Sequence, residues 1–447
     1  MKRTYTFVIL ALLLACAYAL HTRGYFYAVG GVGTHVGWRF AFTLTLFFVT
    51  AAVGAVLPRW RLPVVFVSSL LHLFVMHLPL RATVALAIWI VFYMLVQLRL
   101  SWWLKGIPVL ALYAAPLLLI ELDPTSALNS ALVVCFCVSN FALRSVLYAY
   151  EATKKRELLE GTGLVGYLLC LVASPLTLVN FAPIGFLVLL RGLKKEHDHS
   201  MLWRGVKEIA LGIAFLTAFQ IGSKINALPD YMEVAATADE LHVVTAFVAC
   251  HLLLLKFFLK VAGDIHLAVG MLRVLGFDIA SGTERPYLAR NVLEFWRRWN
   301  TYYRDYLLTL GYYPVAAALK RRPILAAAAG GAAAFVLSGF AHVVQFVARH
   351  PRELTLQRFL EGHVWAIVFG AFVIAWMLRE VTRPRPVGAS ATIKKEAGPL
   401  TWFRQAGAIV ATLSVVSLIL LLYYPPLLNL QLSTCVGVLK AFLRFPS

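Results

Sequence analysis

The sequence predicts an all-α membrane protein: a polytopic transmembrane bundle of roughly 11–14 helices, with re-entrant or broken segments and a central cavity. Three observations support this prediction. The 447 residues are 61% hydrophobic and 14% charged, against about 45–50% and about 25% in soluble globular proteins. The hydrophobic residues form runs long enough to cross a bilayer. The basic residues form short clusters between those runs. An ordinary soluble enzyme is therefore excluded.

The first apolar run covers residues 4–20 and follows Lys2 and Arg3. A cleaved signal peptide and a retained first membrane span share this pattern, and Ala17-Tyr18-Ala19 offers a cleavage site. Because many further apolar runs follow, we expect a retained span.

The loops between the remaining apolar runs alternate in charge. The predicted spans are 38–57, 62–80, 83–98, 107–120, 127–150, 209–228, 241–262, 324–347, 363–378, 408–424 and 428–442. If Lys2 and Arg3 are cytoplasmic, the basic clusters at 59–61, 99–105, 154–156 and 320–322 fall on the same side. The acidic loops at 121–123 and 230–240 then fall outside. We therefore expect a multi-pass protein of the cytoplasmic (inner) membrane, in contact with membrane lipids.

Residues 163–190 are too long for one comfortable span and contain Pro175 and Pro183. Basic clusters lie at both ends, so the chain must leave the cytoplasmic side and return to it. Only a protein-lined cavity tolerates such a broken segment. We interpret residues 1–447 as one membrane-embedded domain whose motif-bearing core is at about 262–348.

Charge and cysteine content exclude two other classes of function. The net charge of +20 would suggest nucleic acid in a soluble protein, but here it follows the topology, so no nucleic-acid partner is expected. All six cysteines lie inside apolar runs without a CxxC pair. They are typical of small buried hydrophobic residues, and no metal site is predicted.

Residues 287–306 are too charged to face lipid and too aromatic for a free loop. A helix at the membrane interface, or packed within the protein, satisfies both constraints. About forty residues later, His342 lies inside an apolar span. An ionisable side chain in a span is a default candidate for function, although such a histidine also commonly bonds a neighbouring helix.

Three sequence elements resemble the membrane-bound O-acyltransferase family, in particular its bacterial polysaccharide-acylating branch of the alginate O-acetylase and teichoic acid D-alanyltransferase kind. The elements are Asp264-Ile265 with Leu275-Gly276-Phe277, the run Phe295-Trp296-Arg297-Arg298-Trp299-Asn300, and Gly339-Phe340-Ala341-His342. The match covers about 262–345. Asn300 replaces the histidine usual in that branch, and Ala341-His342-Val343 replaces Trp-His-Gly, which leaves the substrate class open.

The resemblance implies transfer of an acetyl or other small acyl group from a cytoplasmic thioester to a hydroxyl of a cell-envelope polysaccharide, lipid or other acceptor. His342 would be the general base, because an imidazole in an apolar span is expected to be neutral. Asn300 would be its polar partner and orient the acceptor or the thioester carbonyl. No Ser-His-Asp arrangement is visible, which favours direct transfer over an acyl-enzyme.

The donor would be acyl-CoA or an acyl-carrier-protein thioester, with no bound cofactor. Arg297 and Arg298 are candidates for its phosphates, and anchoring at the membrane surface is the equal alternative. Trp299, Tyr303 and Asp264 are further candidates for substrate or donor binding. Partners would include an acyl-carrier protein or an extracytoplasmic acyltransferase.

The runner-up function is a multi-span transporter or flippase of an envelope precursor. Such a protein should carry several polar or acidic residues inside its spans, and most of the predicted spans carry none. The acyltransferase interpretation is therefore preferred.

Overall fold

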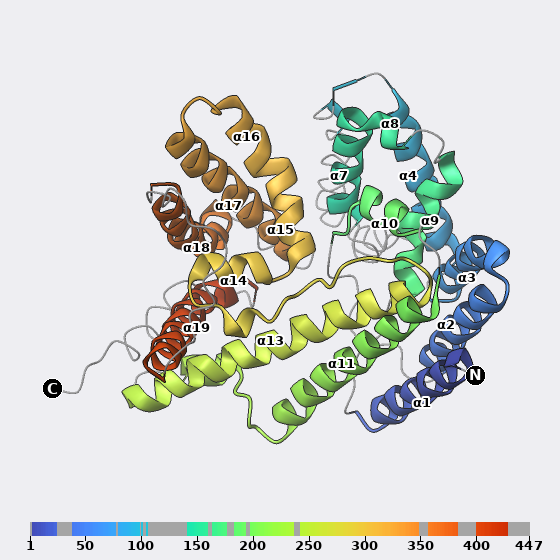
Figure 1. The fold of residues 1–447 in the computed structure, drawn as a ribbon, viewed down its shortest axis with the longest axis horizontal. Helices are drawn as coiled ribbons and strands as arrows, with labels where there is room; N and C mark the ends of the chain where they lie inside the picture. Colours follow the sequence, from blue (N-terminus) through green and yellow to red (C-terminus); the bar gives the residue numbers. More distant parts are fainter. Residues whose placement is uncertain are drawn as a thin grey trace. The chain divides into compact units, whose positions relative to one another are not determined.

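The structure is a computed structural model, and every regular element in its described part is helical (Figure 1). The described residues are 2–24, 38–76, 79–98, 100–101, 104–105, 141–159, 163–176, 183–193, 197–236, 242–347, 356–382 and 399–427. The all-α prediction is confirmed. The predicted spans 107–120 and 428–442, and residues 127–140 of the predicted span 127–150, lie outside the described residues.

Seven helices in the described part are long and apolar enough to cross a membrane. They are α1 (Lys2–Thr22), α2 (Trp38–Val56), α11 (His199–Lys224), α13 (Val243–Val274), α17 (Pro323–Val347), α18 (Leu356–Thr382) and α19 (Pro399–Leu427). Each matches a predicted apolar run, as do the shorter α3 (Arg61–Met76) and α4 (Pro79–Gln97). The chain is an integral multi-pass membrane protein.

The chain forms two compact units. The first contains Met1–Ala227 and Phe257–Gly282, and the second contains Leu228–Lys256 and Thr283–Ser447. Helix α13 contributes its beginning to the second unit and its end to the first.

The first unit is built from α1 to α4, α7 (Phe141–Lys154), α8 (Arg156–Leu159), α9 (Gly163–Leu176), α10 (Phe186–Leu193), α11 and the end of α13. Helix α1 packs on α2 and α11, and α3 packs on α2 and α9. The predicted break in residues 163–190 is present, because α9 ends at Leu176 and Pro183–Gly185 are not helical. Glu151 of α7, which is buried, accepts a hydrogen bond from the backbone N–H of Leu187 in the first turn of α10 (3.3 Å).

Helices α11 and α13 run side by side and touch through glycine (Figure 1). A methyl group on Gly212 would lie 2.7 Å from the backbone nitrogen of Leu267, and one on Gly270 would lie 2.6 Å from that of Ile209. Only glycine allows so close an approach of two membrane helices.

The α11–α13 pair also holds ionisable groups inside its spans. Glu208 accepts hydrogen bonds from His266 Nδ1 and from Arg273 (2.8 Å), and Asp264 pairs with Lys260 (2.8 Å). Helix α13 therefore continues twelve residues past the predicted end at 262, because its polar side chains find partners within the protein. It ends in a cap in which Phe277 N donates to Leu272 O (2.9 Å) and Gly276 has a φ of 97°.

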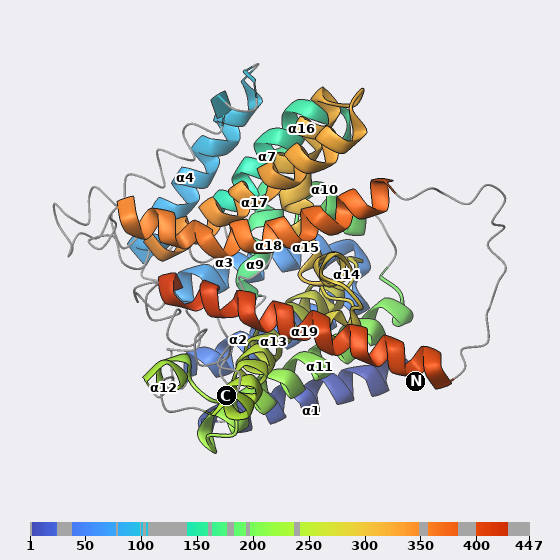
Figure 2. The same cartoon turned by 90° about the vertical axis from the view of Figure 1, so that its left-hand side faces the viewer.

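The second unit contains α12 (Tyr231–Ala236), the start of α13, and the helices from α14 (Val292–Arg298) to α19 (Figure 2). Helix α15 (Thr301–Leu307) continues through a π-helical turn, η3 (Leu308–Tyr312), into α16 (Tyr313–Ala318). A short turn then reverses the chain into α17, against which η3 and α16 pack. Helix α17 packs most extensively on α18. The second unit thus contains a hairpin with α15, η3 and α16 in one arm and α17 in the other.

Candidate active site

The aromatic half of the motif at 295–300 forms part of the core of the second unit. Phe295 and Trp296 of α14 are buried, and the Trp296 ring packs on Phe335 of α17 (4.9 Å between centroids) and on Phe369 of α18 (5.9 Å). Trp299 stacks on Phe295 (5.8 Å). These contacts place the short helix α14 against the α17–α18 pair.

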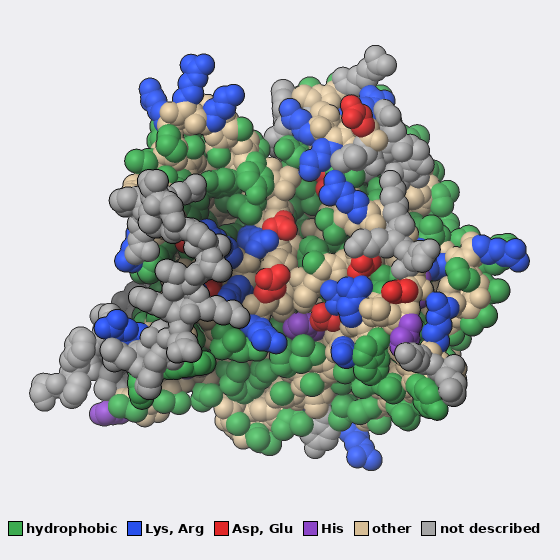
Figure 3. All heavy atoms as spheres, viewed as in Figure 1, with side chains coloured by type: hydrophobic (Ala, Val, Ile, Leu, Met, Phe, Trp, Pro, Cys, Tyr) green, Lys and Arg blue, Asp and Glu red, His purple; other side chains and the backbone are tan. Residues whose placement is uncertain are grey.

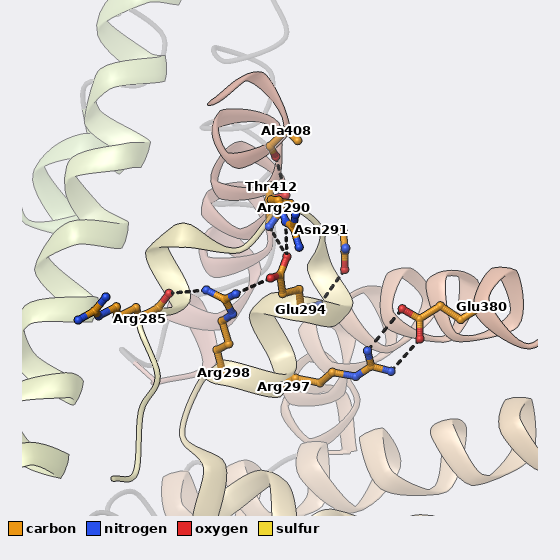
Figure 4. A network of polar contacts seen from close by, with 9 residues as sticks. All are labelled: Arg285, Arg290, Asn291, Glu294, Arg297, Arg298, Glu380, Ala408 and Thr412. Carbon is orange, nitrogen blue, oxygen red and sulfur yellow. Dashed lines mark hydrogen bonds and ion pairs between the residues drawn. The ribbon is translucent and has the colours of Figure 1, made fainter. Parts of the chain in front are cut away.

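The basic half of the motif forms ion pairs at the surface of the same unit (Figure 4). Arg297 donates two hydrogen bonds to Glu380 of α18 (2.8 and 3.4 Å), and Arg298 donates to Glu294 (2.5 Å), which also binds Arg290 (3.3 Å). Burial raises the pKa of Glu294, but hydrogen bonds from Arg290 and the charge of Arg298 outweigh burial, so its pKa lies below the ordinary value. Both predicted phosphate-binding arginines are thus paired with carboxylates.

Asn300 separates α14 from α15, so the predicted continuous helix over 287–306 is broken there. Its backbone is left-handed (φ 37°), a conformation that asparagine tolerates better than most residues. Its side-chain oxygen accepts a hydrogen bond from Tyr303 N (3.3 Å) and so caps α15. The residue is buried, with 6% of its surface exposed. These contacts explain why an asparagine can take this position.

Tyr303 joins the two arms of the hairpin at His342. Its hydroxyl lies 3.1 Å from His342 Nδ1 and 3.2 Å from the hydroxyl of Ser338, both on α17. The Tyr303 and His342 rings also meet edge to face (5.3 Å). Asn300 and His342, the two residues predicted to act together, are therefore linked through Tyr303. The backbone of Tyr303 binds Asn300, and its side chain binds His342.

The contacts of His342 define its tautomer. Nδ1 lies 2.8 Å from the backbone carbonyl oxygen of Ser338, one turn earlier in α17. A carbonyl oxygen only accepts hydrogen bonds, so Nδ1 carries the hydrogen and the lone pair of the neutral ring is on Nε2. With Nδ1–H directed at that carbonyl, the Tyr303 hydroxyl donates to Ser338. The ring is thus held in the form in which Nε2 is the basic atom.

Helix α18 supplies two aromatic residues that the sequence motifs did not reveal. Trp365 meets the His342 ring edge to face (4.8 Å between centroids). His363 packs on Gly339, where a methyl group would lie 2.6 Å from the imidazole carbon Cδ2. No motif marks these residues. The only sequence signal was the glycine three residues before His342, which permits close approach of a neighbouring helix.

Asp264 lies in the first unit, inside α13 and not at the end of a span. It is 1% exposed, and its carboxylate pairs with Lys260 through Oδ2 (2.8 Å). This partner is a lysine one helical turn earlier in the same helix. In the residues that the structure describes, no three His, Cys, Asp or Glu side chains gather as metal ligands would.

The fold and the site define a multi-pass helical membrane protein with an oriented histidine in a span. Comparison with curated proteins confirms the resemblance to the polysaccharide-acylating branch of the membrane-bound O-acyltransferases. The chain is 26% identical to a probable alginate O-acetylase of Pseudomonas putida over 136 residues, which cover 26% of this chain and 27% of that protein.

Two further relatives have the same name. The chain is 25% identical over 135 residues to a probable alginate O-acetylase of Pseudomonas aeruginosa, covering 26% of this chain and 25% of the relative. It is 38% identical over 55 residues to that of Pseudomonas fluorescens, covering 11% of each. The matches thus span about a quarter of the length of the first two relatives. No family model matches the chain.

Proposed function

We propose that the protein is a membrane-bound O-acyltransferase of the cytoplasmic (inner) membrane that transfers an acetyl or other small acyl group from a thioester to a hydroxyl of a cell-envelope polysaccharide. The observation that carries the proposal is the geometry of His342, whose Nδ1–H donates to the Ser338 carbonyl. The likeness to alginate O-acetylases supports the reaction type and the kind of acceptor.

The role of His342 follows from this tautomer. Transfer to a hydroxyl requires a base to take its proton as the oxygen attacks the thioester carbonyl. Nε2 accepts that proton and gives it to the thiolate leaving group when the tetrahedral intermediate collapses, which restores the neutral imidazole. The ring is fixed by Ser338 and Trp365, so its orientation does not depend on the substrate.

Asn300 and Tyr303 support the reacting groups. The Asn300 side-chain oxygen caps α15, and its amide N–H groups can serve the substrate as donors to the developing oxyanion. Tyr303 orients His342 and Ser338 and is a positioning residue. This assignment refines the sequence-based expectation that Tyr303 binds the donor.

The donor would be acyl-CoA or an acyl-carrier-protein thioester, and Arg297 is the better of the two candidate ligands for its phosphates. Both partners of the Arg297–Glu380 pair are about half exposed (55% and 45%), and such pairs are worth little and exchange readily. Arg298 pairs with the more buried Glu294 (17% exposed) and supports α14 instead.

The decisive experiment is a transfer assay with the full chain in vesicles, using a labelled acyl thioester and an envelope polysaccharide as acceptor. We expect His342→Ala to lower the rate by about 10²–10⁴-fold, the usual contribution of a general base. His251→Ala is the matched control. His251 also lies in a span of the second unit, but it bonds Ser414 of α19 (3.1 Å) and should be dispensable. Wild-type acyl transfer by folded His342→Ala protein would refute the mechanism.

A further inference from the structure

The turn between α16 and α17 carries three consecutive basic residues, Lys320, Arg321 and Arg322. All three are exposed. The turn is held by backbone hydrogen bonds from Lys320 to Ala317 (3.4 Å) and from Arg322 to Leu319 (2.8 Å). Figure 3 shows Lys and Arg side chains gathered at the end of the α16–α17 hairpin. The fold thus presents three cations at one point.

These cations differ from three other basic residues of the second unit, whose charge the protein itself pairs. Lys256, Arg290 and Arg304 each form an ion pair with a carboxylate, at 3.4, 3.3 and 2.6 Å. Within the described chain, Lys320, Arg321 and Arg322 form no ion pair or side-chain hydrogen bond. Their charge is therefore not neutralised by the residues that the structure describes, and they can bind an external anion.

The surroundings of the turn are apolar. Tyr313 before the turn and Ile324 after it are each 54% exposed, and Leu325 is 43% exposed. A candidate membrane span begins at Pro323, directly after the last arginine. The N-terminus of the 25-residue helix α17 adds a partial positive charge at the same point. Cations beside exposed apolar residues and a tyrosine are typical of the membrane–water interface.

We propose that the α16–α17 turn is a binding site for anionic phospholipid headgroups, in which Lys320, Arg321 and Arg322 contact the phosphate and Tyr313, Ile324 and Leu325 contact the adjoining acyl chains. An acidic soluble protein would also satisfy the charge. However, it would leave the apolar residues beside the turn in water. The inference does not depend on the acyl-transfer reaction, so the two can fail separately.

The test measures binding of phosphatidylglycerol and phosphatidylcholine to the delipidated full-length protein in detergent by native mass spectrometry. We expect the wild type to prefer phosphatidylglycerol, and the triple variant K320Q/R321Q/R322Q to bind it about tenfold more weakly. Tenfold corresponds to about 1.4 kcal/mol for the three basic residues together, since each of them attracts an anionic surface. Binding of phosphatidylcholine should not change.

A matched variant, K256Q/R290Q/R304Q, removes the same charge from residues that the protein pairs internally, and it should retain the preference for phosphatidylglycerol. The variant K320R/R321K/R322K keeps the charge and should also bind like the wild type. Thermal unfolding in detergent verifies that each variant is folded.

Three results would overturn the proposal. The triple glutamine variant could bind phosphatidylglycerol as the wild type does, or the wild type could bind both lipids equally. Alternatively, glycerol phosphate or polyglutamate could displace phosphatidylglycerol at concentrations near that of the lipid, which would assign the turn to a free phosphate or to an acidic protein.

Discussion

Each unit contains a closely packed helix pair, and the two pairs use glycine differently. In the first unit, Gly212 of α11 and Gly270 of α13 bring backbone against backbone, with 2.6–2.7 Å from a hypothetical methyl group to a backbone nitrogen. In the second unit, Gly331 and Gly339 of α17 and Gly370 of α18 lie against side chains, those of Ile374, His363 and Phe335.

The difference separates a helix pair that serves packing from the pair that carries the proposed base. Backbone contact leaves no space for a reactive side chain, and the ionisable groups of α11 and α13 bond one another. In the second unit, glycine makes room for large side chains, and His342 lies one turn from Gly339. His266 links two helices through Glu208, whereas His342 is oriented by its own helix. Of these two span histidines, we infer that only His342 is a candidate for chemistry.

The largest expected effect comes from adding a methyl group between the backbones of the first pair. We expect Gly212→Ala with Gly270→Ala to cost about 1–3 kcal/mol for each overpacked site and to reduce the yield of folded protein sharply. The acyl-transfer rate per folded molecule should stay near that of the wild type. Detergent-stability measurements and the transfer assay check the two parts separately.

Gly339→Ala should have the opposite result, with a small loss of stability and a clear loss of transfer rate. The added methyl group would meet the side chain of His363, which can move aside, whereas a backbone cannot. Gly407→Ala is the control, since no atom lies within 4 Å of the added methyl group. If the glycine substitutions in both pairs affected stability alone, the distinction between the pairs would be wrong.

A second effect, on the transfer rate and not on stability, is expected for Asn300→Asp. Asn300→Asp keeps an oxygen that caps α15 but removes the amide donor. We therefore expect near wild-type stability and a rate lower by about 10²-fold, as for loss of an oxyanion donor. Asn300→Ala should lose both stability and rate. Full activity of Asn300→Asp would show that Asn300 only caps α15 and does not donate to the oxyanion.

A smaller effect is expected for Tyr303→Phe, which removes one hydroxyl from His342 and Ser338. The rate should fall by about three- to tenfold, the equivalent of one hydrogen bond, while the KM for both substrates stays constant. The pH profile of the rate should shift as well, because the proposed base, His342, loses the neighbouring Tyr303 hydroxyl. A raised KM without a change in kcat would instead indicate that Tyr303 binds a substrate.

The last expected effect concerns the pH dependence of stability in the first unit, not the transfer rate. Burial raises the pKa of Glu151 from 4.5 to about 7, although hydrogen bonds from Leu187 and Phe186 and the charge of Lys155 oppose this. Its folded-state pKa lies above the unfolded value, so stability is greatest below about pH 4.5 and is lost as pH rises to about 7. Since one pKa unit corresponds to about 1.4 kcal/mol, we expect a decrease of about 3 kcal/mol across that window and a plateau above it. Thermal unfolding of Glu151→Gln should lack this decrease.

Hydropathy predicted the long helices well, because an apolar run of sufficient length has few alternatives in a membrane. It placed the end of α13 too early, because the partner of His266 and Arg273 is Glu208, about sixty residues earlier in the chain. A one-dimensional pattern cannot show that such charges neutralise one another.

The sequence motifs singled out His342 and Asn300, but they did not predict which residues these two contact. The break at Asn300 depends on one left-handed residue, and the partner of Arg297 is Glu380, 83 residues later. Trp365 and His363 could not be predicted, because an ordinary apolar helix carries them and only packing against α17 brings them to the site.

The length of α17 bears on the direction in which the proposed acyl transfer crosses the membrane. His342 follows Arg322 by 20 residues of nearly continuous helix, a rise of about 30 Å, which equals the thickness of the hydrocarbon core. If the basic turn lies at the headgroups of one leaflet, the base lies close to the opposite one. A thioester made on the side of the turn would then deliver its acyl group across most of the bilayer, and the reaction would be vectorial without any moving carrier.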